Sequence, residues 1–205
     1  MPEIRQIRPS ECRDWFLTKH YLKRMPPVSY AYGLYEEGEL FGVVSFGKPA
    51  SNSLCKGVCG DSFSEKVYEL NRLVVQEPHP FKNAPSYLVG GALRFLKKKN
   101  LIIVSYADTM MSHCGYIYQA TNWIYTGKTK ARTDMFSEGH PRHYNETTKR
   151  QNRSAKHRYV YFAGDKRFKR SAKASLLYKV EDYPKDVNKR YDAGGSLGTQ
   201  LLLAV

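Results

Sequence analysis

The chain has 205 residues, of which 33 are lysine or arginine and 19 are aspartate or glutamate, so its formal net charge at pH 7 is +14. This length suits one domain with its own hydrophobic core, and so large a positive charge is typical of nucleic-acid-binding proteins, with an anionic membrane surface as the alternative partner. The sequence has neither an apolar run of ~18 residues nor a secretory leader, so we expect a cytoplasmic protein without a membrane span.

Two elements are predicted before residue 48. Residues 10–23 place apolar side chains such as Trp15 near helical spacing, which indicates a short amphipathic helix that ends before Pro26. Residues 28–35 and 40–47 have strand composition, and the Glu-Glu-Gly-Glu segment between them is typical of a turn. We therefore expect an antiparallel hairpin after this helix.

The next segment, residues 48–66, is rich in serine, glycine, asparagine and cysteine and is predicted to be a loop. Cys55 and Cys59 lie in it without a second close pair, so their spacing does not favour a structural zinc site. We interpret them, with Cys12 and Cys114, as free thiols, because disulfides rarely persist in a reducing compartment.

Strands and helices then alternate as far as residue 127. YELNRLVV (68–75) has strand composition, residues 84–99 have an apolar helical face, and residues 101–107 are the most strand-like run. A short helix near 114–121 and a strand in WIYTG follow. This order predicts an α/β unit, in which ligands bind beyond the carboxyl ends of the strands.

Polar side chains gather directly after residues 101–107. Asp108 could accept a proton or hold a nucleobase amino group, Tyr118 could donate a proton or orient the substrate, and Asn122 is a candidate binding residue. The alternatives are that Asp108 caps a helix or turn and that Tyr118 is an ordinary core tyrosine.

Arg72 and Ser86 are candidates for holding negative charge. Arg72 shares the side-chain parity of the inward residues of its strand, so it needs an anionic ligand or a structural carboxylate such as Glu69 or Asp108. Ser86 lies near the amino end of a predicted helix, where backbone N–H groups favour phosphate, although plain helix initiation is the alternative. Lys82 and Asn83, just before it, are candidate binding residues.

A metal site is not predicted from spacing. His20, beside Tyr21, and His113 could each ligate a metal ion, but the chain has no close HxH or HxxxH pair. Phosphate-binding GxxxxGK[ST], dinucleotide-binding GxGxxG and nucleophile-elbow GxSxG motifs are also missing, which disfavours common nucleotide hydrolases, dehydrogenases and serine hydrolases.

Residues 127–175 carry 14 lysines and arginines against four acids, so this segment accounts for +10 of the net charge. Its aromatic side chains could stack on bases while its cations neutralise phosphates, with a solvated surface as the alternative. HRYVYFAGDKRFKR is predicted to form a basic hairpin that turns at Gly164 and returns through SLLYKV. The candidate DNA contacts are Arg142, His143, Arg150, Arg153, Lys166, Arg167, Lys169 and Arg170.

Five segments together resemble the Mom family of phage DNA-modification proteins: YELNRLVV, HPFKNAPSYLVGGALRFL, VSYAD, GYIYQATNWIYTG and HRYVYFAGDKRFKR. The resemblance spans about residues 15–185 and implies a GNAT-type acyltransferase fold that converts DNA adenine to N6-carbamoylmethyl-adenine and so protects phage DNA from host restriction. The family's motif residues fall on His20, Tyr21, Arg72, Ser86, Asp108 and Tyr118. The family is also connected with iron, for which the sequence assigns no ligands.

The resemblance departs from the GNAT pattern at one place. FKNAPSYLVGGA stands where a Gln/Arg-x-x-Gly-x-Gly/Ala phosphate-binding loop is expected, which disfavours ordinary acetyl-coenzyme A binding. An activated glycine, such as glycyl-tRNA, could supply the carbamoylmethyl group after a rearrangement, and an acyl-coenzyme A donor with later amidation is the rival route. Two other functions stay open: a non-catalytic DNA-binding protein on this scaffold, and an acetyltransferase with another acceptor.

The expected architecture is thus an α+β (or α/β) fold with a GNAT-like mixed central sheet flanked by helices. Residues 1–128 are predicted to form the catalytic core, and residues 129–205 a basic, β-rich, nucleic-acid-binding extension packed on it within a single overall domain. The expected partners are double-stranded DNA and, if it is the donor, tRNA.

Overall fold

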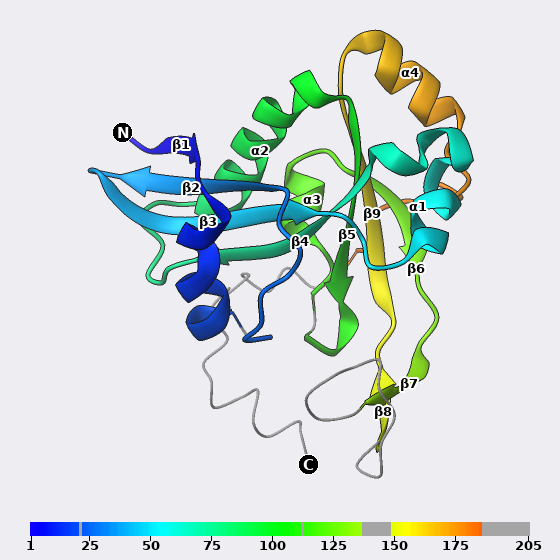
Figure 1. Cartoon of the computed structure of the whole chain (residues 1–205), viewed down its shortest axis with the longest axis horizontal. Coiled ribbons are helices and arrows are strands. Elements are labelled where there is room, and N and C mark those ends of the chain that lie inside the picture. The colour runs from blue at the N-terminus through cyan, green and yellow to red at the C-terminus, as the bar shows by residue number, and fades with distance from the viewer. Residues whose placement is uncertain (21, 112, 137–148, 186–205) are drawn as a thin grey trace.

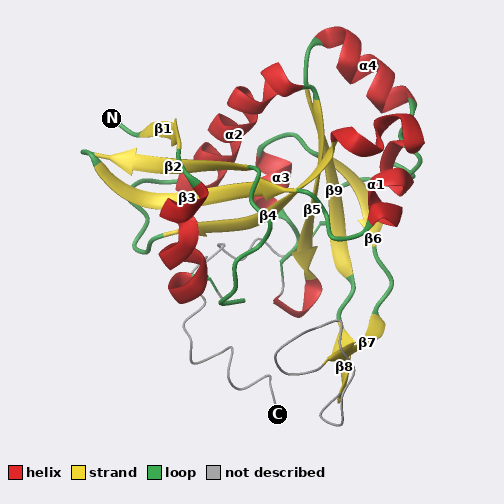
Figure 2. Cartoon of the chain, viewed as in Figure 1, coloured by secondary structure: helices red, strands yellow, loops and turns green. Residues whose placement is uncertain are grey.

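The computed structural model of the chain describes residues 1–20, 22–111, 113–136 and 149–185. Its main body is a seven-stranded mixed sheet with helices on both faces (Figures 1 and 2), as predicted. In order across the sheet, the strands are β1 (Glu3–Gln6), β2 (Tyr30–Glu36), β3 (Glu39–Gly47), β4 (Val67–Val75), β5 (Leu101–Asp108), β9 (Lys156–Ala163) and β6 (Ile124–Lys128). A separate two-stranded sheet pairs β7 (Arg132–Phe136) with β8 (Lys149–Arg153).

In the described part of the chain, four α-helices and several short helical segments accompany the strands. The α-helices are α1 (Asn52–Cys59), α2 (Ala84–Leu96), α3 (Tyr116–Ala120) and α4 (Lys166–Ala174). The short segments are Pro9–Cys12, Trp15–Lys19, Asp61–Lys66, Lys97–Lys99 and Thr109–Met111. None of the described helices is long and apolar enough to cross a lipid bilayer.

The N-terminal helical region and the hairpin agree with prediction. Trp15 and Phe16 are buried against β2 and β3, in one cluster with Val43. Strands β2 and β3 are joined by the two-residue turn Glu37-Gly38, and both turn residues have positive φ (51° and 86°). Such turns match the twist of an antiparallel hairpin, and glycine adopts this conformation without steric cost.

The prediction of a loop over residues 48–66 was wrong, because this segment contains α1 and the Asp61–Lys66 turn. Ser51 caps α1 by accepting a hydrogen bond from the Leu54 N–H (3.2 Å). Cys55, Val58 and Cys59 then fall on one buried face of the helix. All four cysteines are free, as predicted, and the three that are buried serve as small apolar side chains.

A β-bulge in β4 reverses the predicted direction of Arg72. Leu70 lies opposite Phe46, and Arg72 lies opposite Ser45, so one extra residue sits between them on β4. Leu70 packs under α2, whereas Arg72 turns to the other face of the sheet, towards the N-terminal helical region. The prediction that Arg72 shares the parity of the inward apolar residues was therefore wrong, although its side chain is buried.

Strands β4 and β5 pair over only three residues. The parallel register runs from Val67 opposite Ile102 to Glu69 opposite Val104, although both strands continue well beyond this point. At the first unpaired position the Ser105 hydroxyl donates to the Leu70 carbonyl (3.0 Å), in place of a ladder bond. The two strands thus separate towards their carboxyl ends, as their ribbons do in Figure 1.

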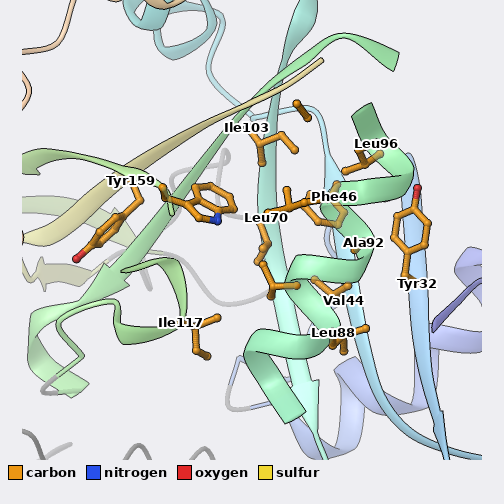
Figure 3. Close-up of a cluster of buried hydrophobic side chains, with 14 of the residues drawn as sticks. Tyr32, Val44, Phe46, Leu70, Leu88, Ala92, Leu96, Ile103, Ile117 and Tyr159 are labelled. Carbon is orange, nitrogen blue, oxygen red and sulfur yellow. The ribbon is translucent and has the colours of Figure 1, made fainter. Parts of the chain in front are cut away.

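The α2 face of the sheet, which is covered by α2 and α3, holds the largest buried cluster (Figure 3). Leu88, Ala92 and Leu96 of α2 point onto Phe46 and Ile103 of the sheet. The opposite face, here called the α1 face, is covered by the N-terminal helical region, α1 and α4. Each buried leucine contributes about 2 kcal/mol relative to an exposed one, so packing of α2 dominates the stability of this layer.

The predicted basic hairpin in HRYVYFAGDKRFKR was also wrong. Residues 156–163 form β9, which lies between β5 and β6 and pairs with both in antiparallel fashion. The chain then enters α4, whose first turn is capped by Asp165 accepting from the Phe168 N–H (2.8 Å). Part of the segment predicted to form a basic, β-rich extension therefore contributes a strand to the interior of the main sheet.

Candidate active site

Asp108 ends β5 and is held there by three donors. Its carboxylate accepts hydrogen bonds from the Met110 N–H (3.0 Å) and the Ser154 hydroxyl, and it pairs with Lys156 Nζ (2.9 Å). Lys156 is the residue directly across from Asp108 on β9. Burial opposes ionisation, but the Ser154 and Lys156 contacts outweigh it and hold the pKa of Asp108 below its ordinary value.

Glu69 is a second carboxylate on the same face, predicted from the sequence only as a partner for Arg72. Burial raises the pKa of Glu69, and the positive charges of Arg72 and Lys156 offset this only in part. Lys156 therefore acts electrostatically on both carboxylates, Asp108 and Glu69. The two carboxylates thus have pKa values displaced in opposite directions, Glu69 upwards and Asp108 downwards.

His20 and Arg72 lie close together at the other side of the strand separation. Burial, followed by the charge of Arg72, lowers the pKa of His20 to about 3, so this imidazole is neutral near pH 7. Its Nδ1 accepts the Leu22 N–H (3.1 Å), which fixes the ring orientation. Arg72 also donates from Nη1 to the Asn71 carbonyl (2.6 Å). The structure thus brings these two predicted residues together.

Tyr118 stands on the opposite side of the sheet, on the α2 face. Its hydroxyl lies 2.8 Å from the Ser105 hydroxyl, at the point where β4 and β5 separate. Its ring packs at 5.1 Å, between centroids, against both Trp123 and Tyr159. The Tyr159 hydroxyl in turn donates to the Cys114 carbonyl, so the loop before α3 is fixed to the same group.

Two groups of predicted residues therefore lie around one feature, the separation of β4 from β5. Asp108 and Arg72 belong to the α1 face and Tyr118 to the α2 face, and the structure does not bring Tyr118 into contact with Asp108. Only where the strands are no longer hydrogen-bonded could one substrate reach groups on both faces. This makes the strand separation the centre of the candidate site.

The start of α2 follows the end of β4 along the chain. Asn83 adopts a left-handed conformation (φ 64°), and the Ser86 hydroxyl donates to its carbonyl (3.0 Å). This contact is compatible with the helix-initiating role of Ser86, whereas phosphate binding there stays a prediction; Lys82 is exposed beside it. In α3, the Gln119 side-chain amide donates a hydrogen bond to the Cys114 carbonyl. Asn122, just after this helix, is exposed and has a left-handed conformation (φ 60°).

The predicted DNA-binding residues divide into two places. Arg153 lines a surface pocket of about 390 Å³ with Arg132 and Ser154, and Ser154 hydrogen-bonds Asp108. Lys166, Arg167, Lys169 and Arg170 belong to α4, at the opposite end of β9. Tyr21, Arg142 and His143 lie outside the described residues, and the side chain of Arg150 is likewise not described.

Iron binding finds no support in this geometry. Within the described residues no three histidine, cysteine, aspartate or glutamate side chains are arranged to hold a metal ion. Asp108 is already engaged by Lys156, and His113 near it has a pKa lowered by burial, with only partial compensation from the Asp108 charge.

The family is decided by comparison over most of the chain. Residues 2–185 match the model of the Mom protein family. The chain belongs to the Mom family. Methylcarbamoylase Mom of Escherichia phage Mu is similar to this chain, with 28% identity over 190 residues that cover 82% of this chain and 77% of that protein.

Solved structures support the GNAT-like fold of this Mom family member. A ribosomal-protein-S5-alanine acetyltransferase from Vibrio fischeri matches with a TM-score of 0.51 at 11% identity, over 79% of this chain and 93% of that one. An N-acetyltransferase from Staphylococcus aureus Mu50 matches with a TM-score of 0.50 at 12% identity, over 80% and 99% of the two chains. At these identities the likeness concerns the fold alone.

Sequence reasoning missed Glu69, Ser105, Ser154 and Lys156 as parts of this Mom-family site. From the sequence, Glu69 was predicted only as a possible structural partner of Arg72. Ser154 and Lys156 are recognisable only when β9 is placed beside β5, because Lys156 is 48 positions from Asp108 along the chain. Ser105 is recognisable only when β4 and α3 are placed beside it. The YELNR motif around Glu69 was the one available signal.

Proposed function

We propose that the protein is a transferase that modifies adenine bases of double-stranded DNA, converting them to N6-carbamoylmethyl-adenine and so protecting phage DNA from restriction in the host cytoplasm. The observation that carries this proposal is the family match over residues 2–185, a range that includes every described group of the candidate site. The name of the phage Mu relative, methylcarbamoylase, supports the transferred group.

The chemistry requires more than simple acylation, because the product has a methylene on the adenine nitrogen. In our scheme the N6 amine attacks the carbonyl of an activated glycine, such as the ester of glycyl-tRNA, and the alcohol leaves. The product, N6–CO–CH2–NH2, can close a five-membered ring when its amine attacks C6. Cleavage of the old C6–N6 bond then gives C6–NH–CH2–CO–NH2, with no atom gained or lost in the rearrangement.

The geometry supports the following roles for the described residues in this scheme. Among the described residues, one carboxylate oxygen of Asp108 is engaged by Lys156 alone, so this oxygen has a lone pair with which to anchor the N6 amino group. Its lowered pKa makes it a better anchor than base. Arg72 stabilises negative charge from the α1 face, and Tyr118 donates a proton from the α2 face. The adenine is flipped out of the duplex to reach the separated strands.

Nucleoside mass spectrometry tests this function. Plasmid DNA from cells that express the protein should contain a new adenosine species with an added C2H3NO. The species should be absent with Asp108→Ala, which removes the anchor, whereas DNA binding should be largely retained because it depends on charge. Unmodified DNA from the wild-type protein, soluble and DNA-bound, would instead support a binding protein without this activity.

Isotope labelling tests the scheme separately. If ¹⁵N is placed at adenine N6, the rearrangement predicts that it ends in the terminal carboxamide. Label that remains bonded to C6 contradicts the rearrangement and favours the acyl-coenzyme A route with later amidation.

A further inference from the structure

Two basic runs that are far apart in the sequence meet at one end of the sheet. Lys97–Lys99 precedes β5, and α4 follows β9. The residue after the first run, Asn100, and the residue before α4, Asp165, are joined by two hydrogen bonds: Asn100 Nδ2 to Asp165 Oδ2 (3.3 Å) and Asp165 N–H to Asn100 Oδ1 (3.1 Å). We call the resulting patch the α4 surface. It consists of Lys97, Lys98, Lys99, Lys166, Arg167, Lys169, Arg170 and Lys173.

The charges of the α4 surface are not explained by folding. Helix α4 is attached through Phe168, which packs on Phe63 (6.1 Å between ring centroids), and through the buried Ala172. Its cations instead stand three and four residues apart, an arrangement that costs a few tenths of a kcal/mol per pair through repulsion. In the described part of the chain none of the eight forms an ion pair with a carboxylate. Asp165, the nearest acid, already caps the helix.

This surface lies at the far end of the sheet from Asp108. Strand β5 begins at Leu101, beside the first basic run, and ends at Asp108, and the antiparallel β9 ends beside α4. Figure 1 accordingly shows α4 at one end of the molecule and β7 and β8 at the other. Seven steps along β5 at ~3.3 Å each separate the two ends by roughly 23 Å.

A group this far from Asp108 does not contact the flipped adenine. B-DNA rises about 3.4 Å per base pair, so roughly 23 Å corresponds to about seven base pairs. Resting on the proposed function, we propose that the α4 surface binds phosphates of the same DNA duplex about seven or more base pairs from the target adenine. The pocket lined by Arg132 and Arg153 is nearer to Asp108, because Ser154 lines it and hydrogen-bonds Asp108.

Duplex length tests this inference. Two duplexes with the same central sequence are compared. One of about 10 base pairs has flanks too short to reach the α4 surface, and one of about 24 base pairs has flanks long enough. The variant Lys166→Gln/Arg170→Gln removes two charges from one stripe of α4 while keeping good helix formers. By fluorescence anisotropy we expect the affinity of this variant for the long duplex to fall about tenfold. The slope of log affinity against log salt concentration should become smaller by about 2, and the affinity for the short duplex should not change.

Two controls separate this effect from others. Lys166→Arg/Arg170→Lys keeps the charge and should bind the long duplex like the wild type. Arg13→Gln/Arg24→Gln removes two exposed charges elsewhere, so it measures the effect of net charge alone. Circular dichroism checks that α4 variants remain folded.

Three outcomes overturn the inference. The variant could lose the same affinity for both duplexes, lose affinity for neither, or lose affinity only for a folded RNA used as competitor. The last would mean that the surface holds a different polynucleotide. These results are independent of the modification assay: length-dependent binding without modified adenosine contradicts only the proposed function, and modified adenosine without length dependence contradicts only the α4 surface.

Discussion

At the scale of single residues, Glu69 and Asp108 differ in how their charge is stabilised. Asp108 has three donors, which favour the carboxylate, whereas Glu69 is half-buried and has its pKa raised by that burial. A carboxyl group that is buried although its charged form is better solvated by water is often retained for function rather than for stability. Glu69 is faced by Arg72 on its own strand, Tyr106 on β5, Lys156 on β9 and Cys55 on α1.

The pH dependence of stability tests this difference. A carboxyl group whose pKa is raised by folding contributes its full stability below the unfolded pKa, and this contribution is lost as pH rises through the folded pKa. Glu69→Gln should therefore melt at a higher temperature than the wild type at pH 8, and the difference should shrink towards pH 4.5. A tenfold change in the acid dissociation constant on folding corresponds to about 1.4 kcal/mol.

A matched control is Glu65→Gln, because Glu65 lies four residues earlier with 93% of its side chain exposed. It should melt like the wild type at both pH values. If Glu69→Gln is instead less stable at pH 8, the charges of Arg72 and Lys156 outweigh burial. Loss of adenine modification in a stabilised Glu69→Gln protein would indicate a role in the reaction.

At the scale of elements, the packing of β3 against the segment before β2 leaves no room for a side chain at Gly47. A Cβ there would stand 1.9 Å from the Pro27 carbonyl oxygen and 2.7 Å from its carbon, both backbone atoms. Gly47 lies opposite Glu69, so this contact helps to position the strand that carries the carboxylate.

Gly47→Ala should consequently lower the free energy of unfolding in urea by about 3 kcal/mol, at the upper end of the cost of overpacking. Gly38→Ala is the control, since Gly38 has a positive φ (86°) but open space around it. It should cost about 1 kcal/mol, from backbone strain alone. Equal losses in the two variants would contradict the close approach to Pro27.

Which elements could be predicted depends on how local their determinants are. The β2–β3 hairpin has its turn and its alternation in one stretch of chain, so its sequence specifies it. Helix α1 was missed because its small, polar residues are typical of a loop, and its face becomes apolar through two cysteines. The direction of Arg72 was missed because nothing in YELNRLVV marks the bulge.

The candidate site follows the same division. Asp108 could be found because it directly follows a strongly apolar strand, and Tyr118 because it lies in a dense polar segment. Their placement on opposite faces depends on α3 and on the separation of β4 from β5. The partners Ser154 and Lys156 depend on β9, whose position is set by long-range pairing.

At the scale of the whole molecule, the insertion of β9 gives a test of the predicted boundary after residue 128. A fragment of residues 1–128 would leave β5 and β6 without the strand that joins them, exposing backbone groups and the apolar faces of both. We expect it to be insoluble or to lack a cooperative unfolding transition, whereas residues 1–185 should unfold cooperatively. A soluble, cooperatively folded 1–128 would support a self-contained core.

The position of β9 also orders events while the chain is being made. Strands β1 to β4 each pair with a neighbour in chain order. Strand β5 instead pairs with β9, whose residues follow their partners by 48 (Asp108 to Lys156) to 62 (Leu101 to Ala163) positions. Until the ribosome has added them, β5 has only its three-residue pairing with β4. The nascent protein therefore passes through a stage in which β5 has an apolar, unpaired edge, and such an edge favours aggregation until β9 pairs with it.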